Sequence, residues 1–182
     1  MKRIFDIILA IVLLSLVFPV LLIIGLFIKF DSKGPIVFKQ ERVGLNGKPF
    51  LLYKFRSMYT DKKGAYYTLE NDPRITKIGR IIRRTSIDEL PQLYNVLIGD
   101  MSFVGPRPNV FNQRDQYTQE QWNLRNSVLP GITGLAQITY RSLATLEERL
   151  NLDLKYVKTQ SLFLDLKILF ETFLKILSKN GN

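Results

Sequence analysis

The chain has 182 residues, enough for one globular domain or for one domain and a membrane segment. It contains no cysteine and no histidine, which excludes disulfides, thiolate chemistry and the commonest general base at neutral pH. Its net charge of +10 favours an anionic partner, such as a lipid surface, a phosphate-rich substrate or nucleic acid.

An uncharged apolar run extends from Ile7 to Ile28. In a helix, this run would cover about 33 Å, which is enough to cross the bilayer core. A cleaved signal peptide would also begin with basic residues such as Lys2 and Arg3. Its apolar part is shorter, however, roughly 7–15 residues, and no small-x-small cleavage site follows here. From the residues alone, a plain spanning helix is the default interpretation.

Pro19 lies near the middle of this run and removes an intrahelical hydrogen bond, which kinks a helix. Ser15 precedes it by four residues and could satisfy the carbonyl group that Pro19 leaves free. Lys29 and Lys33 follow the run, so positive charge flanks both ends and is compatible with both ends in the cytoplasm. A re-entrant helix, which enters and leaves the same leaflet, is therefore the alternative.

The rest of the chain predicts an α+β fold that is mostly helical. Ile36–Phe38 and Phe50–Phe55 are β-prone and indicate a small hairpin around a turn at residues 45–47. Helical patterns occupy residues 75–84, 85–98, 111–127, 145–160 and 162–178. Loops are expected at 59–73 and 99–108, and a short extended piece at 135–140. The helices at about 75–84 and 162–178 are amphipathic, so each either lies on the membrane surface or packs on the core.

The densest functional signal is the acidic pair Asp88 and Glu89, just before Pro91, which favours the first turn of a helix. Ser86 and Glu89 have the spacing of a capping box, so the pair alone has a purely structural interpretation. Adjacent carboxylates also suit phosphoryl transfer, in which one attacks phosphorus and Mg²⁺ reduces charge repulsion. Without histidine or cysteine, a carboxylate is among the few nucleophiles left.

Basic residues surround the acidic pair along the sequence. Arg107 lies between two prolines that fix the backbone, an arrangement suited to bidentate phosphate binding. Lys54 and Arg56 alternate with aromatic residues on a predicted strand and would share one face. Arg83 precedes the acidic pair by a few residues. The alternative for each is a solvated basic surface.

These motifs together resemble the bacterial sugar transferase group, the monotopic phosphoglycosyl transferases, in its minimal single-domain form. The matching segments are KRIFD (2–6), PIVF (35–38), YKFRSM (53–58), SIDELP (86–91), GDMS (99–102), GPRP (105–108), PGITG (130–134) and LDLK (164–167). The resemblance implies a re-entrant membrane helix over residues 1–30, broken near Pro19. It also implies a catalytic domain over residues 31–182 with interfacial helices, at the cytoplasmic face of the bacterial inner membrane.

The resemblance further implies a two-step, Mg²⁺-dependent reaction between a UDP-sugar and undecaprenyl phosphate. Asp88 would attack the β-phosphate, release UMP and hold the sugar-1-phosphate covalently until the polyprenyl phosphate takes it. Asp88 would also contact the metal, and Glu89 would position the metal or handle the proton of the acceptor. Phosphate binding is implied for Arg107, with Lys54, Arg83 and Arg141 as further candidates.

The chain departs from the family pattern at two places. Phe18 stands where relatives often have a serine before the proline, so Ser15 would have to take that role. Residues 139–142 read TYRS where many relatives read NGRN, which hints at an unusual sugar. The sugar, the pathway and the oligomeric state, a homodimer among the options, stay open.

Two other classes of function compete with the enzyme. A membrane-anchored, non-catalytic scaffold would also be basic and amphipathic and would bind anionic lipid. A nucleic-acid-binding protein would explain the charge, but no matching motif is found and residues 7–28 would have no role. We therefore expect no nucleic-acid partner.

Overall fold

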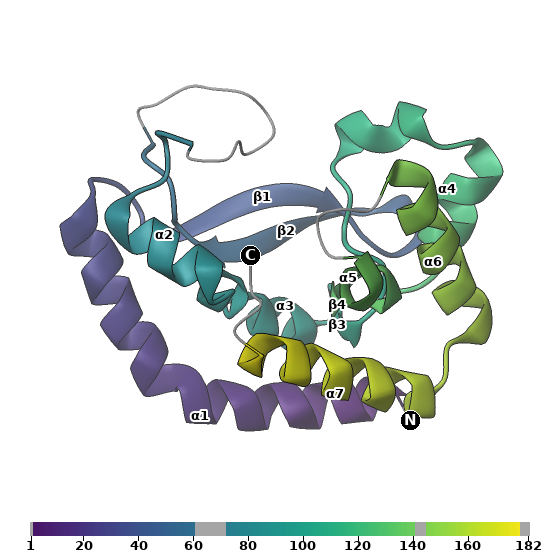
Figure 1. Ribbon diagram of the computed structural model, residues 1–182, viewed down its shortest axis with the longest axis horizontal. Helices are drawn as coiled ribbons and strands as arrows, with labels where there is room; N and C mark the ends of the chain where they lie inside the picture. Colours follow the sequence, from purple (N-terminus) through teal and green to yellow (C-terminus); the bar gives the residue numbers. More distant parts are fainter. Residues whose placement is uncertain (1, 61–71, 141–144, 179–182) are drawn as a thin grey trace.

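The computed structural model describes residues 2–60, 72–140 and 145–178 (Figure 1). The helices are α1 (Lys2–Asp31), α2 (Lys77–Arg84), α3 (Gln92–Ile98), α4 (Gln119–Arg125), α5 (Leu135–Tyr140), α6 (Leu146–Thr159) and α7 (Leu162–Leu177). The strands are β1 (Val37–Val43), β2 (Pro49–Phe55), β3 (Ser102–Val104) and β4 (Gly131–Thr133), with 3₁₀ turns η1 (Leu45–Gly47), η2 (Ile87–Glu89) and η3 (Phe111–Gln116). The predicted mostly helical α+β composition is confirmed.

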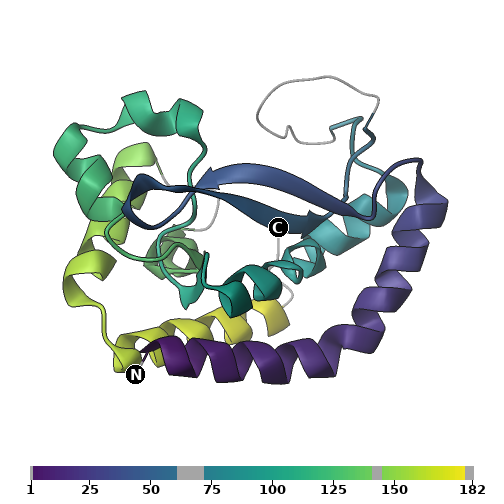
Figure 2. The same ribbon diagram turned by 180° about the vertical axis from the view of Figure 1, so that it is seen from behind.

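Helix α1 is one continuous element, and it is clearly bent in both views of the molecule (Figures 1 and 2). It contains Pro19, whose missing N–H group and bulky ring disturb the helix at this point. Within the described ranges, α1 is the one helix long and apolar enough to cross a membrane. Its large apolar side chains are mostly exposed, as at Leu16, Phe18 and Phe27. Such a surface suits contact with lipid.

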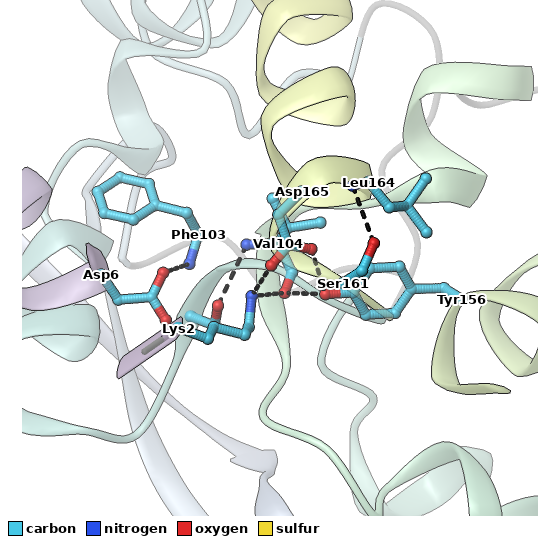
Figure 3. A network of polar contacts seen from close by, with 9 residues as sticks. Lys2, Asp6, Phe103, Val104, Tyr156, Ser161, Leu164 and Asp165 are labelled. Atoms are coloured by element: carbon cyan, nitrogen blue, oxygen red, sulfur yellow. Dashed lines mark hydrogen bonds and ion pairs between the residues drawn. The ribbon is translucent and has the colours of Figure 1, made fainter. Parts of the chain in front are cut away.

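Charged side chains attach the beginning of α1 to the domain (Figure 3). Lys2 forms an ion pair with Asp165 of α7 and donates a hydrogen bond to the carbonyl oxygen of Val104 at 3.3 Å. Arg3 donates to the carbonyl oxygens of residues 96 and 97, at 2.6 and 3.0 Å, in the last turn of α3. A cation at the C-terminal end of a helix also interacts favourably with the helix dipole.

The other end of α1 is attached to the same domain. The buried guanidinium group of Arg56 donates to the carbonyl oxygens of Ile28, at 3.1 Å, and Ser32, at 2.6 Å. Asp31 accepts a hydrogen bond of 3.1 Å from the backbone N–H of Ile78, near the N-terminus of α2. Both ends of the bent helix are therefore bound to one body.

The predicted hairpin is confirmed, although its first strand is longer than expected. β1 and β2 pair in antiparallel register from Val37 opposite Phe55 to Val43 opposite Pro49. The second half of β1 was not predicted, because residues 39–42 are polar. Such residues are compatible with a strand here, since one face of a two-stranded sheet can remain in solvent. In the turn between the strands, Asn46 takes a left-handed conformation with φ of 55°.

A second, parallel sheet joins β3 to β4, so the prediction of a loop throughout 99–108 is wrong for residues 102–104. The two strands are only three residues each, too short for a clear periodic signal. Gly105 follows β3 directly, and a Cβ atom there would lie 2.3 Å from the carbonyl oxygen of Leu129. Only glycine allows this close backbone approach.

Residues 135–140 form helix α5, so the predicted extended segment is wrong. Ile138, Thr139 and Tyr140 have β-prone side chains, which suggested a strand. In the structure, Ala136 and Ile138 are buried, and the helix contacts α6 and α7. Tertiary packing therefore overrides the local preference.

The two predicted amphipathic helices pack on the domain and also expose apolar side chains. In α2, Ile82 is buried and Ile81 is exposed, and in α7, Ile168 is buried and Phe163 is 80% exposed. Core packing therefore holds one face of each helix, and contact of the exposed face with a membrane stays a prediction.

Candidate active site

The acidic pair lies in η2, a short turn that leads into α3. Ser86 precedes it in a left-handed conformation, with φ of 55°, and its side chain makes no capping hydrogen bond. The capping-box interpretation of Ser86 and Glu89 is therefore wrong. The left-handed residue reverses the direction of the chain after α2. The Glu89 carboxylate binds two cationic side chains instead of capping the turn.

Glu89 is the electrostatic centre of the site. Its Oε1 atom accepts hydrogen bonds from Lys54 Nζ, at 2.7 Å, and from Arg107 Nη2, at 2.8 Å. Burial alone would raise the pKa of this carboxyl, but Arg107 and Lys54 outweigh it and lower the pKa to about 2. Glu89 is therefore ionised at neutral pH.

Asp88 has a different environment from that of its neighbour. It is 8% exposed, and its carboxylate has no hydrogen-bond partner among the described residues. Burial raises the pKa of Asp88; Lys54 opposes this effect, and the negative charge of Glu89 adds to it. The site thus holds one carboxylate engaged by cations and one with free lone pairs, an arrangement typical of divided catalytic roles.

The other basic residues singled out in the sequence differ in where they lie relative to the acidic pair. Lys54 and Arg107 meet at Glu89, and Arg83 lies close enough to lower the pKa of Asp88 while donating to the Ser57 hydroxyl at 3.3 Å. Burial lowers the pKa of Lys54, and Glu89 counteracts this effect. Arg56 does not share the site, because it binds the end of α1. Arg141 lies outside the described residues.

Asn95 positions the dyad relative to Lys54, a role that the sequence analysis missed. The side chain is fully buried in α3 and is bonded to the backbone of β2. Its Oδ1 accepts from the N–H of Tyr53 at 3.0 Å, and its Nδ2 donates to the carbonyl oxygen of Leu51 at 2.7 Å. One sequence signal for such a role is a polar residue on the apolar side of a short helix.

The loop that carries Arg107 is fixed through its own backbone. Each of the four consecutive carbonyl oxygens of residues 106–109 accepts a hydrogen bond from a different partner. The donors are Gly131 N (3.0 Å, to Pro106), Arg125 Nη2 (2.6 Å, to Arg107), Arg42 Nη1 (3.1 Å, to Pro108) and Val43 N (2.8 Å, to Asn109). The prediction of a rigid loop around Arg107 is therefore confirmed.

The residues present also fit Mg²⁺ bound together with a substrate. Across residues 2–60, 72–140 and 145–178, no group of three or more acidic side chains forms a metal cage. Mg²⁺ commonly binds through one or two carboxylates and the phosphates of its substrate, and it keeps several water ligands. The unpaired carboxylate of Asp88 is the donor in this site that suits such a metal.

Comparison of the sequence with known proteins identifies a family. The profile described as bacterial sugar transferase matches residues 1–179. The chain belongs to the bacterial sugar transferase family. The resemblance of its motifs to this family is therefore confirmed, and the match includes every residue of the site described above.

Individual relatives of this bacterial sugar transferase bear specific names. The UDP-glucose:undecaprenyl-phosphate glucose-1-phosphate transferase of Escherichia coli is 47% identical, over 96% of this chain and 40% of the relative. The sugar transferase EpsL of Bacillus subtilis is 46% identical, over 100% of this chain and 89% of the relative. An N-acetylgalactosaminephosphotransferase of Aeromonas hydrophila, specific by name for UDP-N-acetylgalactosamine and undecaprenyl phosphate, is 40% identical, over 99% of this chain and 44% of the relative. This bacterial sugar transferase chain thus spans less than half the length of the first and third of these proteins.

Proposed function

We propose that this chain transfers a sugar-1-phosphate from a UDP-sugar to undecaprenyl phosphate and that Asp88 forms a covalent intermediate. The observation that carries the proposal is the contrast within the dyad. The Asp88 carboxylate has no hydrogen-bond partner among the described residues, whereas Glu89 holds two cations beside it. Relatives are named as undecaprenyl-phosphate sugar-phosphate transferases, which supports the same reaction here.

In the first step, an oxygen of Asp88 attacks the β-phosphorus of the UDP-sugar. A bond from Asp88 to phosphorus forms, the bond from that phosphorus to the bridging oxygen breaks, and UMP leaves with the electron pair. In the second step, a phosphate oxygen of undecaprenyl phosphate attacks the same phosphorus and releases the Asp88 carboxylate. The product is undecaprenyl diphosphate sugar, the first membrane-bound intermediate of a glycoconjugate.

Glu89 and its cations prepare the site for the negative charge of the diphosphate. Glu89 orients Lys54 and Arg107 before substrate arrives, so less reorganisation is needed when charge develops on the phosphoryl oxygens. Arg107 has a half-exposed side chain and can bind phosphate oxygens on its open side. Mg²⁺, with Asp88 as a ligand, would neutralise part of the diphosphate charge.

The test of this reaction is UMP release from a panel of UDP-sugars in the presence of undecaprenyl phosphate and Mg²⁺. Wild-type protein mixed with a sugar-labelled donor alone should retain the label covalently, and D88N should neither retain label nor release UMP. Asp115 is an exposed carboxylate of η3, so D115N serves as the matched control and should behave as wild type. UMP release by D88N would exclude Asp88 as the nucleophile, and a chain inactive on every donor would favour the scaffold.

We also propose that α1 is re-entrant and that the domain lies on the cytoplasmic face of the inner membrane. A straight helix of 30 residues would separate its ends by about 45 Å, more than the bilayer core of about 30 Å. Instead, α1 is bent, and Arg3 and Arg56 bind its two ends to the same domain. A spanning helix would break one of these attachments.

The topology can be tested directly because the natural chain contains no cysteine. One variant carries a cysteine ahead of Met1, and the other carries Asn123→Cys on the exposed side of α4. In intact cells, a membrane-impermeant maleimide should label neither variant, and permeabilisation should expose both. Labelling of only one variant before permeabilisation would establish a spanning helix.

A further inference from the structure

A buried ion pair lies behind the loop that carries Arg107. Arg125 of α4 and Asp153 of α6 are each 2% exposed, and Arg125 Nε and Nη2 lie 2.9 and 2.8 Å from Asp153 Oδ2. Removing two charges from water is costly, and a buried pair is weak evidence for stability by itself. A contribution to stability therefore does not by itself explain this ion pair.

The same guanidinium group reaches the active-site loop. Arg125 Nη2 also donates a hydrogen bond of 2.6 Å to the carbonyl oxygen of Arg107. The planar fork of arginine presents several N–H groups at fixed angles, so one side chain can bind a carboxylate and a carbonyl oxygen at once. The guanidinium group of Arg125 is thus bound to Asp153 and, at the same time, to the loop that carries Arg107.

The backbone of the loop is sensitive to this contact. Pro108 fixes its own φ angle and restricts Arg107 to extended conformations, so the ψ angle of Arg107 within that range sets the orientation of the peptide group between the two residues. The carbonyl oxygen of Arg107 belongs to that peptide group, and the bond from Arg125 fixes it. The orientation of this group is coupled to the direction in which the Arg107 side chain leaves the backbone, toward Glu89.

We propose that Arg125, oriented by Asp153, is a positioning residue that aims Arg107 at the phosphate-binding site. This inference rests on the proposed function, because it assigns Arg107 a role in binding the phosphates of the donor. Arg125 does not touch substrate; it acts through the carbonyl oxygen of Arg107. A displacement of about 1 Å in a positioned group can reduce a rate by about 100-fold.

A double-mutant cycle on UMP release tests the proposal. R125K keeps a positive charge beside Asp153, but its single ammonium group lacks the fork that also reaches the carbonyl oxygen of Arg107. We expect R125K to lower kcat/KM for the UDP-sugar by about tenfold or more. We expect R107A to lower it further and R107A/R125K to equal R107A within about twofold, because the effect of Arg125 requires the Arg107 side chain.

The control is R114K, another arginine of the same region, which donates to the carbonyl oxygen of Tyr117 at 2.9 Å and, among the described residues, makes no hydrogen bond to residues 106–109. Its effect should be small and should multiply with that of R107A. If the losses in R125K and R107A multiply fully, Arg125 has a merely structural role and the inference is overturned. If R107A releases UMP at the wild-type rate, the proposed role of Arg107 fails first, and the inference fails with it.

Arg42 supplies a second variant in case R125K does not fold. Its half-buried side chain holds the next carbonyl oxygen of the loop, that of Pro108, at 3.1 Å. R42K should lower kcat/KM in the wild-type background and have no further effect in R107A. A loss of equal size in both backgrounds would show that the loop contacts do not act through Arg107.

Discussion

Lys54 Nζ and Glu89 Oε1 lie 2.7 Å apart, although the two residues belong to different elements and are 35 positions apart in the sequence. The contact joins the edge of the hairpin to the turn that holds the dyad. The same Glu89 oxygen also binds Arg107, so three separate segments meet at one atom.

Glu89→Gln should remove the common partner of Lys54 and Arg107 while keeping the shape of the side chain. The neutral amide cannot orient two cations, so we expect UMP release to fall by about 100-fold or more. Loss of charge-assisted hydrogen bonds should also lower the unfolding free energy by about 1–3 kcal/mol. Kinetics and thermal melts would measure the two effects, with the exposed Glu120→Gln as control. Activity within twofold of wild type would contradict the organising role of Glu89.

The pH dependence of the reaction should report Asp88. The nucleophile must be ionised, and burial raises its pKa, so kcat/KM should fall on acidification at a pH above the ordinary value of 3.8. Arg83 opposes that shift, so in R83Q the acidic limb of the profile should move to higher pH. Glu89, with a pKa of about 2, should not contribute to this limb. If the acidic limb did not move in R83Q, Arg83 would have no electrostatic effect on the pKa of Asp88.

Asp88→Asn should stabilise the fold while it removes activity. Because the folded-state pKa of Asp88 is raised, the folded protein binds the proton more tightly, and stability falls as pH rises through the interval above 3.8. At pH 7 the neutral amide avoids this cost, so D88N should have the higher Tm, and the difference should vanish below pH 3.8. A lower Tm for D88N at pH 7 would contradict an electrostatic cost at this position.

Asn95→Ala should separate the dyad from Lys54 by loosening α3 on β2. The variant loses one hydrogen bond to each of two backbone groups of β2, at Tyr53 and Leu51. Leaving these groups unsatisfied should cost about 2–4 kcal/mol of unfolding free energy. Denaturant titration would measure this loss, and Asn123→Ala, at an exposed position of α4, is the control. If Asn95→Ala and the control were equally stable, the bonds to β2 would carry no net stabilisation.

The parts of the fold that were predicted correctly have strong local signals. The apolar run of α1, the Asn-Gly turn of the hairpin and the two prolines beside Arg107 all act through nearby residues. The parallel pairing of β3 with β4 depends on residues almost 30 positions apart and on glycine contacts. No local pattern contains that information.

The candidate site was likewise predicted only in part. Residue chemistry and family motifs indicated Asp88, Glu89 and Arg107, and the structure brings Glu89 and Arg107 into contact beside Asp88. The different environments of the two carboxylates could not be predicted, because they depend on burial and on which cation reaches which oxygen. Arg56 illustrates the limit: its spacing predicted one strand face shared with Lys54, yet its guanidinium group binds the end of α1.

Helix α3 has one further consequence. Its last carbonyl groups bind Arg3, at the start of the apolar helix, and its first turn follows directly after the dyad. Seven residues of helix span about 10 Å. Helix α3 is thus a single short element that joins the dyad to the start of α1. Lengthening α3 by one turn would add about 5 Å between the Arg3 contact and the dyad, and it would therefore change where Asp88 lies relative to α1.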